Sequence, residues 1–82
     1  MIHAEFDELS PGDRVRFEGN DTTYTVLELR TDFYYPIEER IVYLTPDDDS
    51  YVRKVGMYDA DAKQMHRVES GKNLSDFYHG SF

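Results

Sequence analysis

Arginine recurs along the parts of this chain in which polar and apolar residues alternate. If residues 14–18 form a strand, Arg14 and Arg16 point to the side opposite Val15 and Phe17. Arginines on neighbouring strands, with tyrosine rings beside them, make the charged groove that holds single-stranded nucleic acid. The candidate nucleic-acid-binding residues are Arg14, Arg16, Arg30 and Arg67, with Tyr34 or Tyr35 nearby.

These arginines have a structural alternative, because acids alternate with them. Glu18, Glu28 and Glu69 could pair with them across strands, and each such pair stabilises a sheet by a few tenths to about 1 kcal/mol. The 82 residues carry 17 Asp or Glu against 9 Lys or Arg, a net charge of −8 that repels phosphate. We therefore favour ion pairing and keep nucleic-acid binding as the alternative function.

The acids themselves suggest a third function. Asp outnumbers Glu by 10 to 7, and Arg outnumbers Lys by 6 to 3, a bias typical of salt-adapted organisms or of acidic bacterial and phage proteins. A dense carboxylate surface, with the run Asp47-Asp48-Asp49, could imitate the phosphates of DNA and inhibit a nucleic-acid-binding protein. The nine interspersed bases make this chain a weak mimic.

Aromatic residues cluster at two places that we expect to be exposed. Three consecutive rings precede Pro36, and three consecutive rings cannot all enter a small core. Exposed Tyr and Phe are preferred anchors of protein interfaces. The alternatives are that these rings cap the ends of the fold, or that the C-terminal rings form a weak homodimer. The candidate protein-binding residues are Phe33, Tyr34, Tyr35, Phe77 and Tyr78.

Catalytic and metal-binding patterns are missing from the sequence. There is no Cys, and His3, His66 and His79 show no metal-ligand spacing. No Ser lies in the sequence context of an activated nucleophile. We therefore expect no catalytic residue, no metal site and no cofactor. Apolar runs are only a few residues long, so we also expect a cytoplasmic protein that does not enter a membrane.

The order of hydrophobic and turn residues predicts a small antiparallel sheet. A lead-in segment, residues 1–9, should fold Phe6 and Leu9 over one end of the core. In a strand over residues 22–29, Val26 is apolar on one face, whereas Leu27 and Leu29 are apolar on the other. This change of face indicates a bulge or burial on both faces. We expect strands at about 14–18, 22–29, 40–45, 51–57 and 64–69. Between them we expect a long loop or irregular hairpin tip over 31–40 and a short helical or 3₁₀ turn at 58–62.

This order carries a resemblance. The Pro11-Gly12-Asp13 turn, the strand Val15-x-Phe17, the strand 24–29 and the later Val42-x-Leu44 are similar to SH3-like barrels, including the KOW and Tudor-like members. The resemblance covers about residues 9–68 and implies an all-β, five-stranded SH3-like barrel with a one-turn helix before the last strand. It implies no functional residue, because such barrels serve many functions.

We expect one domain over residues 1–70 and a flexible aromatic tail over 71–82. The favoured function is a non-catalytic adaptor, a monomer or weak homodimer, whose exposed aromatics meet a protein partner. The expected core is Val15, Phe17, Tyr24, Val26, Leu27, Leu29, Ile41, Tyr43, Val52, Val55, Met65 and Val68.

Overall fold

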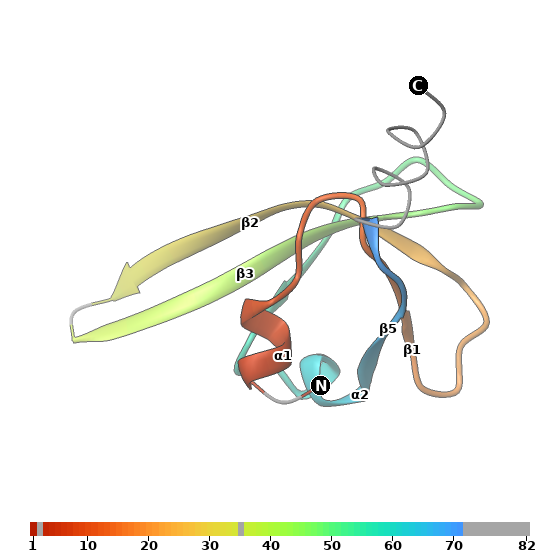
Figure 1. The fold of residues 1–82 in the computed structure, drawn as a ribbon. Helices are drawn as coiled ribbons and strands as arrows, with labels where there is room; N and C mark the ends of the chain where they lie inside the picture. The colour runs from red at the N-terminus through yellow and green to blue at the C-terminus, as the bar shows by residue number, and fades with distance from the viewer. Residues whose placement is uncertain (2, 35, 72–82) are drawn as a thin grey trace, which may run out of the picture.

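The computed structural model describes residues 1, 3–34 and 36–71, and it consists mainly of one antiparallel sheet (Figure 1). Five strands lie in the order β4-β3-β2-β1-β5, and a short helix precedes the last strand, as the sequence predicts. The elements are α1 (His3–Asp7), β1 (Arg14–Phe17), β2 (Tyr24–Tyr34), β3 (Ile37–Pro46), β4 (Arg53–Gly56), α2 (Ala60–Gln64) and β5 (Met65–Glu69).

The sheet is not closed into the barrel that the resemblance implies. β4 pairs only with β3, and β5 pairs only with β1, so these two strands are the edges of an open sheet. The connection between β4 and β5 is α2, which packs its buried Ala62 into the core. The two helices have five residues each, far from the roughly 20 that cross a bilayer, and the described residues contain no longer helix.

A bulge at Leu27 decides which side chains of β2 and β3 enter the core. Val26 pairs with Leu44 and Glu28 pairs with Tyr43, which leaves Leu27 as the extra residue on β2. Leu27 is 45% exposed, so its predicted burial is wrong. The change of face seen in the sequence is a bulge.

Because of the same register, the face of β3 that enters the core is the opposite of the predicted one. Val42 and Leu44 are fully buried, whereas Ile41 and Tyr43, which we expected in the core, are only half-buried. Every position from 41 to 44 is apolar, so alternation cannot select a face. The pairing of Leu44 with Val26 selects it instead.

Two further core predictions are wrong for local reasons. Val52 precedes β4 and is 57% exposed. Val68 is 42% exposed because Arg14 pairs with Glu69 and Val15 pairs with Arg67, which skips Val68 on β5. The observed core cluster is Phe6, Leu9, Val15, Phe17, Tyr24, Val26, Val42, Leu44, Val55, Ala62 and Met65, with Leu29 packed against it.

The predicted long loop or irregular hairpin tip over residues 31–40 is instead a regular hairpin. β2 and β3 remain paired out to Tyr34 and Ile37, and Pro36 lies in the turn between them. At that position the missing N–H of proline disturbs no ladder bond. The paired strands run together away from the helices (Figure 1), and the longest dimension of the molecule is 47 Å against 27 and 23 Å for the others.

The entry into β1 is fixed by Asp13, whose side chain is buried. Ser10 N donates to Asp13 Oδ2 at 2.9 Å, and Gly71 N donates to Asp13 Oδ1 at 2.6 Å. Gly12, in the Ser10–Asp13 turn, has a φ of +92°. Residues with a side chain rarely adopt this conformation, so the turn favours glycine at this position. The carboxylate therefore holds the start of β1 beside the end of β5.

We predict that Asp13→Ala lowers the free energy of unfolding by about 1–3 kcal/mol, because it leaves the partly buried N–H groups of Ser10 and Gly71 without their acceptors. Urea denaturation followed by circular dichroism measures the change. Asp21→Ala, at an exposed acid, is the matched control and should change stability by less than about 0.5 kcal/mol. Equal effects of the two substitutions would contradict this role of Asp13.

Candidate functional site

The outer part of the β2–β3 hairpin projects with no third strand on its β2 side among the described residues. β1 pairs with β2 only at Tyr24 and Thr25, and β4 pairs with β3 only from Ile41 to Leu44. We call residues 29–34 and 37–40 the hairpin arm. Its strands hold each other by backbone pairing, because few of its side chains reach the core.

Large apolar side chains lie at the end of the arm. Phe33 is 73% exposed, Tyr34 is 60% exposed and Ile37 is 54% exposed. Tyr34 pairs with Ile37, so these two side chains share one face, whereas Phe33 points to the other face opposite Glu38. We call Phe33, Tyr34 and Ile37 the arm tip. It presents apolar surface on both faces of a ribbon.

The structure thus places two of the five predicted protein-binding residues together and adds Ile37 to them. Ile37 was missed because a lone Ile after Pro36 gives no signal until the register sets it opposite Tyr34. The predicted residues Tyr35, Phe77 and Tyr78 lie outside the described residues.

Acidic side chains lie next to the arm tip. Asp32 lies directly opposite Glu39, and Glu38 lies opposite Phe33. The nearest arginine of β3 is directed elsewhere, since Arg40 Nε lies 3.9 Å from Asp7. The tip is therefore apolar with an acidic border.

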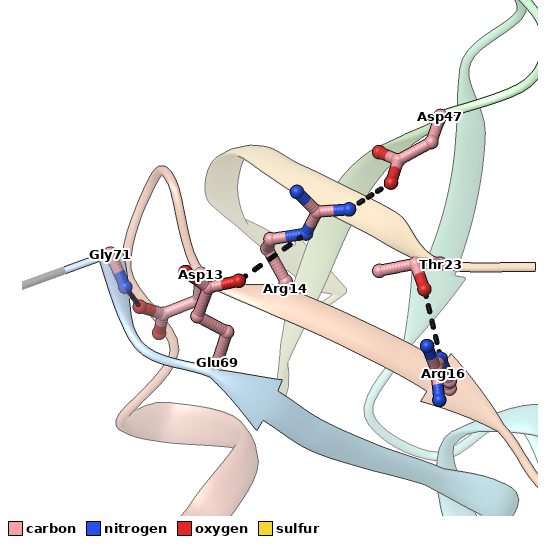
Figure 2. Close-up of polar contacts among 7 residues, drawn as sticks. All are labelled: Asp13, Arg14, Arg16, Thr23, Asp47, Glu69 and Gly71. Atoms are coloured by element: carbon pink, nitrogen blue, oxygen red, sulfur yellow. Dashed lines mark hydrogen bonds and ion pairs between the residues drawn. The ribbon is translucent and has the colours of Figure 1, made fainter. Parts of the chain in front are cut away.

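Arg14 and Arg16 lie side by side on the outer face of β1, and both have partners (Figure 2). Arg14 forms an ion pair with Asp47, and its Nε lies 3.8 Å from Glu69. Arg16 donates from Nε to Thr23 Oγ1 at 2.8 Å. These contacts tie β1 to the start of β2, to the end of β3 and to β5.

Arg30 and Arg67 do not join this pair in one cluster. Arg30 lies beyond the bulge, 2.9 Å from Glu28, with its guanidinium 5.2 Å from the centroid of the Tyr43 ring. Arg67 pairs in register with the buried Val15, on the inner face of the sheet, and lies 3.6 Å from Asp13. The four arginines are thus divided between two faces, and Arg14, Arg30 and Arg67 each lie near a carboxylate.

Part of the predicted ion pairing is present. Glu28 and Glu69 lie near arginines, as the structural alternative expects, whereas Glu18 makes no ion pair with any described residue. Glu28 and Arg30 are neighbours along β2 rather than across strands. The acids Asp13 and Asp47, which that alternative did not include, supply the other partners.

Arg53 forms a cluster that the sequence did not reveal. Its guanidinium lies 3.9 Å from the centroid of Phe17 and 5.4 Å from that of Tyr24, and it donates to Asp61 Oδ2 at 2.8 Å. It also donates to the Tyr24 hydroxyl at 3.2 Å. No spacing along the chain relates these residues, because they come from four separate segments. The cluster joins β4 to α2 and covers one margin of the core.

Tyr51 extends this cluster through its hydroxyl, which lies 3.2 Å from the hydroxyl of Tyr24. The hydrogen bond to Tyr24 is the main cause that raises the pKa of Tyr51 above its ordinary value, and partial desolvation adds to it. Because the folded-state pKa is above the unfolded one, the contribution of this group to stability is present below the unfolded pKa. It is lost as the pH rises through the folded pKa.

A shallow polar depression of about 410 Å³ lies beside Asp13, lined by Glu8, Ser10, Asp13, Arg67 and Ser70. Asp13 is already engaged by Ser10, Gly71 and Arg67. Elsewhere in residues 3–34 and 36–71, no group of three His, Asp or Glu side chains is placed to hold a metal ion.

Comparison with protein-family models, with curated protein sequences and with solved structures found no match to this chain.

We predict that Tyr24→Phe lowers the pKa of Tyr51 toward its ordinary value, because it removes the hydrogen bond between the two hydroxyls. Nuclear magnetic resonance of chain labelled with ¹³C at the tyrosine ζ carbon follows the titration of each ring. Tyr58→Phe is the control and should leave the Tyr51 titration in place. An unchanged pKa of Tyr51 in the Tyr24 variant would rule out this contact.

Proposed function

We infer that this chain is a non-catalytic protein-interaction module and that the arm tip is its contact surface. The observation that carries this proposal is the exposure of Phe33, Tyr34 and Ile37 at the end of a projecting two-stranded arm. The core is complete without them, so they do not serve to stabilise the fold. A partner that covers them would remove apolar surface from water.

The form of the tip supports recognition of a groove in a folded partner. Backbone pairing out to Tyr34 and Ile37 limits the conformations of the tip, which lowers the entropy lost on binding. Aromatic side chains in such positions commonly carry most of the binding energy of an interface. The acidic border formed by Asp32, Glu38 and Glu39 favours a groove with basic residues at its rim.

We further propose that the fold is related to SH3-like barrels. The support is the succession of strands, the pairing of the last strand with the first, and the short helix between β4 and β5. This relationship adds nothing about function, since the arm is what distinguishes this chain as a binding module.

Nucleic-acid binding is the weaker hypothesis for this chain. Arg14 and Arg30 lie close to carboxylates, and Arg67 is on the other face of the sheet. A phosphate would have to displace these partners against a net charge of −8. We propose instead that the arginines stabilise the sheet.

We predict that Phe33→Ala with Tyr34→Ala removes the binding of protein partners without unfolding the chain. Affinity capture with the wild-type chain as bait, quantified by mass spectrometry, should recover a partner that the double variant reduces by at least about tenfold, as expected for two anchor residues. Val52→Ala is the control, because Val52 is equally apolar and 57% exposed but lies far along the chain from the arm. A partner captured equally by all three baits would contradict the proposal.

We predict no salt-sensitive binding when the pure chain is titrated with short single-stranded RNA or DNA at low and high salt. Fluorescence anisotropy is the measurement, and Arg14→Glu is the matched variant because it removes the ion pair with Asp47. Binding that is strong at low salt, weak at high salt and lost in Arg14→Glu would support the nucleic-acid hypothesis instead.

A further inference from the structure

One edge of the hairpin arm has no pairing strand among the described residues. On the β1 side of β2, Val26 O still accepts a hydrogen bond from Gly12 N at 2.8 Å. Beyond the bulge at Leu27, no described strand pairs with β2 on that side. An edge of this kind is a template for pairing with another strand.

The contact between β3 and Met57 shows which backbone groups point to this edge. Arg40 O accepts from Met57 N at 2.9 Å, so the Arg40 carbonyl points away from β2. In an antiparallel ladder, two residues opposite each other direct their N–H and C=O groups either both toward the partner strand or both away from it. Arg40 lies opposite Thr31. The N–H and C=O of Thr31 therefore point away from β3, and those of Leu29 and Phe33 do the same by alternation.

The sequence around Thr31 is complementary to itself in antiparallel pairing. With Thr31 opposite the Thr31 of a second copy, Arg30 faces Asp32 of that copy on one side of the sheet. On the other side Leu29 faces Phe33 of the second copy. The contact of Arg30 with Asp32 and that of Leu29 with Phe33 each occur twice, because the pairing has two-fold symmetry. All the outward N–H and C=O groups of residues 29, 31 and 33 find partners in this register.

Two features of the single chain favour this partner. Asp32 lies directly opposite Glu39, and neither acid makes an ion pair with a described residue. The Glu39 carboxylate is directed toward Gly56 of β4, so Asp32 is the acid at the β2 edge, and Arg30 of a second copy would lie opposite it. Phe33 is 73% exposed, whereas Leu29 is half-buried at the margin of the core, so the pairing of these two side chains covers apolar surface.

We propose that the β2 edge of the hairpin arm binds the same edge of a second copy of this chain, in antiparallel register centred on Thr31. The two arms then form a continuous four-stranded sheet. This explains how a two-stranded ribbon, marginal on its own, is kept in a regular conformation. The inference concerns the backbone edge and does not depend on the proposed function of the arm tip.

Proline substitutions on the two edges of the arm test the pairing. Thr31→Pro removes an N–H that the hairpin itself does not use, and it should weaken self-association by at least about tenfold. Glu38→Pro is the matched control, because Glu38 lies opposite Phe33 and directs its N–H to the other edge of the arm. It should leave self-association unchanged. Sedimentation velocity of the full chain over a concentration series, at an ionic strength that screens the net charge, measures both.

Charge reversal tests the register. Arg30→Asp and Asp32→Arg each bring like charges together across the two-fold axis, and each should weaken the dimer by about tenfold. The double variant R30D/D32R restores opposite charges and should return the dissociation constant to within about threefold of wild type. This rescue requires residues 30 and 32 of different copies to face each other.

Three results would overturn the proposal. The first is a wild-type chain that remains monomeric at every concentration tested, including the case in which its own C-terminal residues occupy the edge. The second is an equal effect of Thr31→Pro and Glu38→Pro. The third is a double variant as weak as either single charge reversal.

Discussion

The ladder between β2 and β3 is the interaction on which the rest of the structure depends. It is the longest pairing in the sheet, from Tyr24 with Pro46 to Tyr34 with Ile37, and its register determines both the core and the arm. The bulge at Leu27 turns Val26 and Leu29 to the same side, so the inner half of the hairpin buries Val42 and Leu44. Beyond Arg30 and Ile41 the same ladder continues without a third strand among the described residues. The inner part of the hairpin therefore contributes to the core, and its outer part projects from the sheet.

Most of the arginines of this acidic chain lie beside individual carboxylates, and they do not form one continuous positive surface. Arg14 joins β1 to Asp47 and Glu69, Arg67 reaches the buried Asp13, and Arg53 packs on aromatic rings beside Asp61. Each contact links segments that are distant in the sequence. Partly exposed ion pairs are individually weak, so we regard these arginines as fixing the positions of the strand ends more than as a large source of stability. The arm differs in this respect, since Asp32 and Glu39 face each other there without a described cation.

The arm links the proposed contact surface with the proposed self-pairing. Its tip offers apolar side chains, while its β2 edge offers backbone groups, and Phe33 belongs to both surfaces. A dimer paired through the edges would carry two tips in a symmetric arrangement. Such a dimer could engage a partner with two equivalent sites, and the gain would come from effective concentration without any new contact.

The sequence by itself determined the number and order of strands, the short helix before the last strand, and most of the residues that anchor the inner core. These follow from local alternation and turn chemistry, as in Val15-x-Phe17 after Pro11-Gly12. It also indicated exposed rings before Pro36, as Phe33 and Tyr34 are, although it predicted a long loop or irregular hairpin tip over residues 31–40. Only the tertiary structure decided the face of β3, because residues 41–44 are all apolar and the choice depends on pairing with Val26. The open sheet, the Arg53 cluster and the place of Arg67 on the inner face likewise depend on contacts between distant segments. Local patterns carry no information about such contacts, because register is set by the partner strand and not by the strand alone.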